Sequence, residues 1–330
     1  MKRFALLSLL AIAVLVAVVP ASAQDAVDPA AVDAVAAALA ATQSQSSLHL
    51  NTQVFTESNR GTDQAGISQQ DVLVFDLAPM ADGWNLAGSQ TTSAATPMGA
   101  MDTVSDIIVL DGTVYLRLTS GGGESGGFGG MFPEGWFTLD SLEQNAGGQG
   151  RFGGFDATSV VNRIVGPLLL PVTADSVLGA SELPADQIDG QAMRVIQITL
   201  DSQALIDSTA SAMLGAGGGM MMMGGPGMRQ DGDSAQAMPM LQGTPPAGGP
   251  DGQMPDGAMP PDGGMQALTP ENVRMTFAVY IGQDDGLVHR LYAVTDQGSG
   301  DGQFSQPTTT RTDLSAFGAP VSISAPELSS

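Results

Sequence analysis

Ser125 lies in a stretch that matches a catalytic motif. Gly123-Glu124-Ser125-Gly126-Gly127 has the G-x-S-x-G spacing of the loop that presents a serine nucleophile. Such a serine needs a histidine base, which in turn needs a carboxylate to orient it. The chain has two histidines, His49 and His289, and both lie in segments whose alternation predicts strands. Ser125 lies in a run of glycines rather than at a strand-to-helix elbow, so we expect no catalytic residue and no enzymatic activity.

The methionines are the residues best suited to hold a metal. Eleven of the 18 fall between Met213 and Met265, and thioethers are soft ligands that select Cu(I). The same stretch is low in complexity, with Met220–Met223 beside a glycine run, and no ligand geometry is set. The chain lacks cysteine and paired histidines, which disfavours zinc, and Lys2 is its single lysine, which excludes Schiff-base chemistry and a P-loop. We therefore predict no metal site and no cofactor.

The charge balance restricts the partners. The formal net charge is −23, and a surface of this sign repels nucleic-acid phosphates and anionic lipid headgroups. We predict that the protein binds no nucleic acid, that it contacts membranes only transiently, and that it is a monomer kept soluble by its acidity.

The first 23 residues have the pattern of a secretory signal. Lys2 and Arg3 precede an apolar run over 4–19, and Ala21-Ser22-Ala23 forms an A-x-A cleavage site. The run is shorter than the ~20 residues that a spanning helix needs, although an uncleaved anchor is an alternative. We expect cleavage near Ala23 and a location outside the cytoplasm, either secreted or in the cell envelope, including a periplasm. Without cysteine, the mature chain has neither disulfides nor a lipobox.

The mature chain begins with one helix and continues with strands. Asp28 and Pro29 favour a helix start, and Val32, Val35 and Leu39 give the segment 29–45 a buried stripe. Asp111-Gly112 and Asp189-Gly190 predict tight turns between antiparallel strands. A second helix is predicted over 156–170 and a third short one over about 201–214. Period-two alternation predicts strands at 48–54, 72–77, 84–90, 103–110, 113–119, 136–139, 177–183 and 193–200.

Residues 215–267 differ from the rest. They are rich in Met, Gly and Pro, which break both periodicities, so we predict a disordered insertion. Alternation returns at 273–281, 287–293 and 302–311, with a short terminal strand at 321–323. The late hairpin is too small to be stable alone. We therefore expect a single domain from 24–214 and 268–330, although a linker between two domains is an alternative.

Three stretches resemble a known family. They are Asp111–Leu116 followed by Pro133–Phe137, Phe277–Gly282 followed by Gly286–Leu291, and Asp313–Val321 with Ile323 and Pro326. Their order and spacing are similar to the LppX/LprAFG-type lipid-binding envelope proteins, relatives of the LolA/LolB carriers. The resemblance covers about 30–214 and 268–328. The missing lipobox cysteine and the Met-rich insertion depart from the family pattern, so membrane anchoring does not carry over.

The resemblance implies a fold and a function. The fold would be α+β: a strongly curved antiparallel sheet, or half-open β-barrel, packed on a few helices around an apolar cavity for acyl chains. We therefore expect a non-enzymatic envelope protein that binds or carries a lipid or other lipophilic small molecule. The alternative is an envelope sensor or protein-interaction module with a filled core. The predicted ligand-binding residues are Leu73, Phe75, Trp84, Tyr115, Trp136, Phe277 and Leu291.

Overall fold

The structure is a computed structural model that describes most of the chain outside its termini and its long Met-rich stretch. By contacts the chain divides into a unit of residues 1–217 and 270–330 and a second unit of 218–269. The predicted signal peptide, the stretch around Ser125, most of the predicted third helix and the predicted insertion lie outside the described residues. The structure describes residues 27–60, 67–81, 83–96, 99–121, 135–141, 157–201, 204, 274–298 and 304–328.

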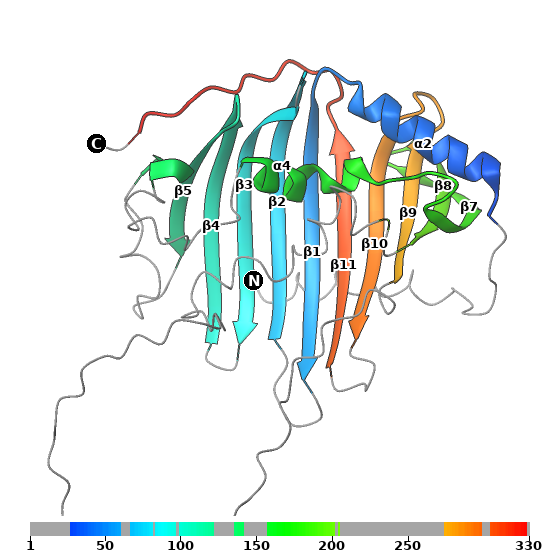
Figure 1. Ribbon diagram of the computed structural model, residues 1–330, viewed down its shortest axis with the longest axis horizontal. Coiled ribbons are helices and arrows are strands. Elements are labelled where there is room, and N and C mark those ends of the chain that lie inside the picture. Colours follow the sequence, from blue (N-terminus) through cyan, green and yellow to red (C-terminus); the bar gives the residue numbers. More distant parts are fainter. Residues whose placement is uncertain are drawn as a thin grey trace, which may run out of the picture. The chain divides into compact units, whose positions relative to one another are not determined.

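The described strands form one antiparallel sheet of eleven strands (Figure 1). Their order across the sheet is β6-β5-β4-β3-β2-β1-β11-β10-β9-β8-β7, so β6 and β7 are the two edges and the sheet is not closed. The predicted α+β fold with an open, curved antiparallel sheet is confirmed. The strands are β1 (Leu48–Arg60), β2 (Ile67–Met80), β3 (Gly83–Thr96), β4 (Gly99–Leu110), β5 (Thr113–Gly121), β6 (Phe137–Thr138), β7 (Val177–Ile188), β8 (Gln191–Leu200), β9 (Arg274–Gly282), β10 (Val288–Gly298) and β11 (Phe304–Ser315).

Two of the hairpin turns follow directly from their residue types. Asp111 and Gly112, between β4 and β5, have φ of 49° and 79°, and Asp189 and Gly190, between β7 and β8, have φ of 51° and 84°. Two successive residues with positive φ define the two-residue turn whose twist matches that of the flanking strands, and Asp-Gly accepts that conformation readily. Both turns were predicted from the sequence.

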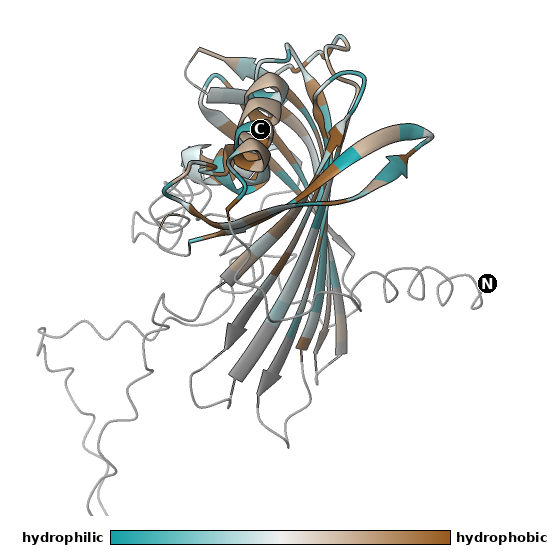
Figure 2. Cartoon of the chain, turned by 90° about the vertical axis from the view of Figure 1, so that its right-hand side faces the viewer, coloured by the Kyte–Doolittle hydropathy of each residue, from teal (hydrophilic) through white to brown (hydrophobic). Residues whose placement is uncertain are grey.

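The helices pack on one side of the sheet. Helix α2 (Pro29–Gln43) begins where Asp28 accepts a hydrogen bond from the Ala30 N–H at 3.0 Å, and Val32, Val35 and Leu39 are buried as predicted. Helix α4 (Ala157–Val165) continues into the 3-10 helix η1 (Gly166–Leu169). Figure 2 shows α2 beside one face of the sheet. Among the described helices, none is long and apolar enough to cross a membrane.

The face of the sheet that packs against these helices is called here the interior face, and the opposite one the outer face. Alternation along each strand decides which residues belong to each. On β2, for example, Leu73, Phe75 and Leu77 are buried within the main core together with residues of α2, α4 and η1, whereas Asp76 is exposed. A second, smaller cluster of Met193, Val195 and Tyr280 lies outside this core.

The structure differs from the sequence-based prediction in two respects. Most strands are longer than predicted, and β1 continues beyond Val54 to Arg60. The predicted terminal strand at 321–323 is wrong. Pro320 and Pro326 cannot donate to a ladder, and the segment runs across the ends of the strands in Figure 1. In this segment the structure has only an isolated bridge, from Leu328 to Trp136.

Candidate functional site

The interior face carries a broad apolar surface built by strand register. Leu50 lies opposite Phe75 on β2 and opposite Leu314 on β11, and all three side chains are buried. On the same face, nearer the β7 edge of the sheet, Phe277 of β9 lies between Ile198 of β8 and Ala293 of β10. The apolar surface therefore extends from β5 to β8, and helix α2 packs against the same core.

The structure brings together five of the seven residues predicted to bind a ligand. Leu73, Phe75, Phe277 and Leu291 belong to the core on the interior face, with at most 4% of each residue exposed. Trp84 on β3 is partly buried and packs against the same core. Binding by these five residues stays a prediction, but they share the face on which it was predicted.

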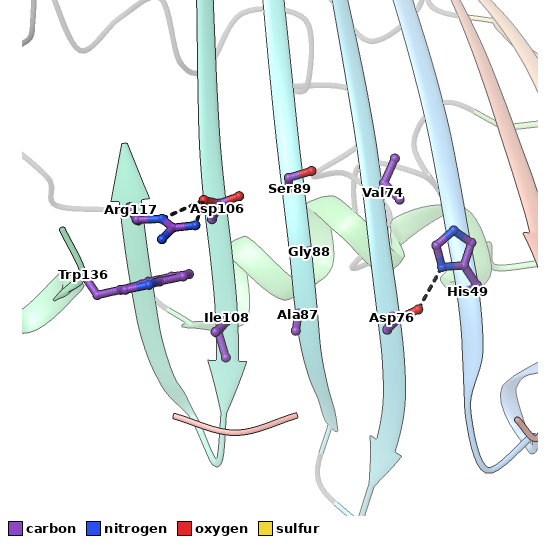
Figure 3. Close-up of a pocket in the computed structure, with 10 residues that line it drawn as sticks. All are labelled: His49, Val74, Asp76, Ala87, Gly88, Ser89, Asp106, Ile108, Arg117 and Trp136. Atoms are coloured by element: carbon purple, nitrogen blue, oxygen red, sulfur yellow. Dashed lines mark hydrogen bonds and ion pairs between the residues drawn. The ribbon is translucent and has the colours of Figure 1, made fainter. Parts of the chain in front are cut away.

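Tyr115 and Trp136 are not brought together with the other five. Tyr115 lies between Val114 and Leu116, which pack in the interior core, so its own side chain points to the outer face. Trp136 lines a hollow on that outer face (Figure 3). The prediction that they bind the same ligand as Phe75 rested on the resemblance, whereas the structure places Tyr115 and Trp136 on the face opposite to Phe75.

A polar zone interrupts the apolar interior face. Asp71 on β2 is 1% exposed and accepts hydrogen bonds from Gln69 Nε2 at 2.8 Å and from Thr92 Oγ1. Gln90 Nε2 lies 3.5 Å from the same carboxylate. Next to this cluster the hydroxyls of Thr52 and Thr312 are 2.9 Å apart, and both residues are buried. The zone therefore lies at the centre of the sheet, on β11 and β1–β3.

Arg163 of α4 adds a positive charge to this polar zone. Burial lowers the pKa of its guanidinium, and the negative charge of Asp71 partly offsets that effect. A buried guanidinium is tolerated when it has charged and hydrogen-bonding partners, because leaving water is costly for an ion. Arg163 and Asp71 thus form an electrostatic link between α4 and the interior face.

Sequence reasoning missed both members of this link, although a signal for each was present. Asp71 has the same strand parity as Leu73, Phe75 and Leu77, but the predicted strand began one residue later, at Val72. Arg163 follows Val160 and Val161 and precedes Ile164, so it is a charge within an apolar helix segment. A charged residue at a position that the apolar pattern of its strand or helix assigns to the buried side indicates a buried polar site.

The interior face combines two kinds of side chain. Within the described ranges there is no group of three or more His, Asp or Glu side chains arranged to hold a metal ion. The interior face instead offers apolar side chains over most of its area and hydrogen-bonding groups around Asp71. A ligand that fits this face has a large apolar part and, beside it, groups that form hydrogen bonds.

Comparison with known proteins gives structural neighbours only. No protein-family model matches the chain, and no curated protein matches it significantly. The chain resembles LprF and LppX. LprF from Mycobacterium bovis is 15% identical, the match covers 92% of this chain and 99% of LprF, and the TM-score is 0.43. The Mycobacterium tuberculosis lipoprotein LppX is 15% identical, with 90% and 100% covered and a TM-score of 0.37.

A third neighbour is more distant. A DUF1329 family protein from Desulfovibrio piger is 10% identical, the match covers 89% of this chain and 94% of that protein, and the TM-score is 0.22. The solved structures similar to this chain thus include members of the group that its sequence motifs resemble. At this identity the likeness concerns the fold and assigns no ligand to the chain.

Proposed function

We propose that this chain is an exported cell-envelope protein that binds or carries a lipid or another lipophilic molecule on its interior face. The observation that carries the proposal is the set of apolar side chains that extends across one face of an open sheet, from Leu116 on β5 to Ile198 on β8. Transfer of a CH₂ group from water to such a surface contributes about 0.8 kcal/mol, so an acyl chain gains affinity with each carbon that it buries.

The polar zone around Asp71 limits the kinds of ligand that match the interior face. Gln69 and Thr92 already donate hydrogen bonds to Asp71, so this zone is polar but internally satisfied, and the apolar part of a ligand gains little where it lies against it. An amphiphile with a hydrogen-bonding group beside its chain matches both parts of the interior face. The net charge of −23 disfavours strongly anionic headgroups and lasting contact with an anionic membrane.

Native extraction tests the binding proposal. The protein is purified from its envelope fraction without detergent, extracted with organic solvent, and the extract is analysed by mass spectrometry. We expect one class of amphiphile in near-stoichiometric amount, and we expect the extracted protein to bind a neutral fluorescent lipophile that the recovered amphiphile displaces. An empty extract, together with failure of the extracted protein to bind the fluorescent probe, would overturn the proposal.

Export is tested separately. N-terminal sequencing of the protein recovered from the envelope fraction should begin at Gln24 if the predicted signal is removed near Ala23. An intact N-terminus at Met1 would instead support the uncleaved anchor. Recovery of all the protein in the cytoplasmic fraction would contradict export.

A further inference from the structure

The outer face carries a hollow of about 390 Å³ that the lipophile proposal does not use (Figure 3). Its floor lies on β3, where Ala87, Gly88 and Ser89 are consecutive small residues. The flanking strands β2 and β4 contribute Val74 and Ile108, so the small residues of β3 lie in a trough between larger side chains. This volume is within the range of about 300–1,000 Å³ that is usual for small-molecule sites.

One rim of the hollow is a fixed donor–acceptor pair. Arg117 on β5 directs both Nε, at 2.8 Å, and Nη2, at 2.7 Å, to the same oxygen, Oδ2 of Asp106 on β4. The guanidinium also lies over the Trp136 ring, 4.9 Å from its centroid. A carboxylate and an indole therefore hold Arg117 in place. The contact uses Oδ2 of Asp106, so Oδ1 remains as an acceptor for a ligand, and Arg117 has further N–H groups that can donate to it.

The other rim repeats this chemistry. His49 on β1 and Asp76 on β2 are joined by an Nδ1–Oδ1 contact of 2.8 Å, and their side chains are 36% and 53% exposed. The contact uses one ring nitrogen and one carboxylate oxygen, so Nε2 of His49 and Oδ2 of Asp76 can meet a ligand. Figure 3 shows this pair and the Arg117–Asp106 pair on the same side of the sheet, with α4 behind the strands.

The spacing of the two pairs sets the size of the ligand. Asp76 lies opposite Ala87 of β3 and Asp106 lies opposite Ser89, so the two aspartates are two strands apart and offset by two residues along the strands. With about 4.8 Å between strands and about 3.4 Å per residue, the two residues are separated by about 12 Å. Apolar side chains of Val74, Ala87 and Ile108 lie between them. A ligand must therefore combine hydrogen-bonding groups at both ends with an apolar surface between them.

A saccharide has this combination. Its hydroxyls both donate and accept, as the two rims require, and the C–H faces of its rings pack against apolar and aromatic side chains. Asp106 is paired with Arg117, and Asp76 shares a hydrogen bond with His49, so each carboxylate already has one polar partner. The net charge of −23 disfavours acidic sugars. We propose that this hollow binds a neutral saccharide of two or more rings.

Calorimetric titration of the protein with cellobiose, maltose and diacetylchitobiose tests the proposal, with spermidine as the cationic comparison. We expect saturable binding of at least one disaccharide and none of spermidine. Arg117→Gln and Trp136→Ala should each weaken that binding about tenfold or more, since each removes a directional contact. Arg194→Gln is the matched control, because Arg194 forms a comparable exposed ion pair with Glu182 outside the hollow.

Fluorescence gives a second readout. The chain has two tryptophans, Trp84 on the interior face and Trp136 in the hollow, so Trp84→Phe leaves emission from Trp136 alone. The disaccharide should shift that emission along the same binding curve. No disaccharide binding at the highest soluble concentration, equal binding by Arg117→Gln, or preferential binding of spermidine would each overturn the proposal. Far-UV circular dichroism confirms that every variant is folded, and none of these outcomes bears on the lipophile proposed for the opposite face.

Discussion

The backbone N–H of Val288, at the start of β10, donates a hydrogen bond to the hydroxyl of Thr42, 2.9 Å away. Thr42 lies in the last turn of α2 and is fully buried, and its hydroxyl in turn donates to the Ala38 carbonyl at 2.8 Å. One side chain thus joins the N-terminal helix to a strand that follows it by 246 residues. The contact fixes where α2 meets the interior face.

Replacement of Thr42 by Val keeps its shape and removes the acceptor. The Val288 N–H would then be buried without its partner, so we expect the free energy of unfolding to fall by about 1–3 kcal/mol. Thr42→Ser keeps the hydroxyl and should lose clearly less. Chemical denaturation followed by circular dichroism measures both variants, and wild-type stability of Thr42→Val would contradict a stabilising role of the hydrogen bond.

Gly88 should not tolerate a side chain. A Cβ at this position would lie 2.0 Å from the Val74 carbonyl oxygen and 2.6 Å from Cδ1 of Phe75. Because the first of these atoms is backbone within a paired strand, relief requires movement of β2 against β3. We expect Gly88→Ala to destabilise the protein by about 1–3 kcal/mol or more. Ser89→Ala is the neighbouring control on the outer face and should change thermal stability little.

The electrostatic interaction between Asp71 and Arg163 predicts coupling between them. Asp71→Leu removes the acceptor of Gln69 and Thr92 and the negative charge that acts on Arg163, so we expect a loss of about 1–3 kcal/mol. In the double variant Asp71→Leu/Arg163→Leu both buried charges are absent, and much of the loss should be recovered. A double-mutant cycle by urea denaturation measures this coupling. Strictly additive losses would contradict an interaction across the interior.

Asp285 gives a prediction on pH. Burial raises the pKa of its carboxyl, but hydrogen bonds from the Leu287 N–H, His289 and Gln191 outweigh burial and hold the pKa below its ordinary value. The stability that it contributes is therefore present above the pKa of an unfolded aspartate and is lost as the pH falls through the lower folded value. Asp285→Asn should melt at a lower temperature near neutral pH. Its melting temperature should also change less than that of the wild type at acidic pH.

Two adjacent positions on β10 test which face binds the lipophile. Ala293 lies between Phe277 and Thr310 on the interior face and is 3% exposed, whereas Val294 is 40% exposed on the outer face. Ala293→Trp should abolish or strongly reduce binding of the fluorescent lipophile, because it fills interior space, and Val294→Trp should not. Near-wild-type binding by a folded Ala293→Trp variant would place the ligand elsewhere.

Local signals predicted the fold better than they predicted the site. Asp111-Gly112, Asp28 and the alternation in 273–281 each indicated its element, because the physical cause lies within a few residues. The part of β1 after Val54 was missed, since Thr56, for example, is polar yet buried, and its hydroxyl contacts that of Thr308 on β11, 252 residues away. No local pattern contains that partner.

The candidate site was poorly predicted from the sequence for a related reason. Tyr115 and Trp136 were predicted to share a site with Phe75, but the face of Tyr115 depends on strand parity, which the packing of Val114 and Leu116 against the core determines. The hollow between Asp76 and Asp106 needs β2, β3 and β4 as neighbours and three small residues on the middle strand. The composition of each strand alone does not reveal it.

The pairing of β1 with β11 has a consequence for how the chain acquires its structure. β2 to β5 pair with their sequence neighbours, but residues 48–60 pair on their other side with residues 304–315. Contacts between such distant residues form slowly, because a long loop must close first. A chain that is threaded through a membrane from its N-terminus would therefore expose one edge of β1 until nearly the whole polypeptide has emerged. During that interval β1 would be open to pairing with other chains, so a chain exported in this way would most need a holding chaperone during its translocation.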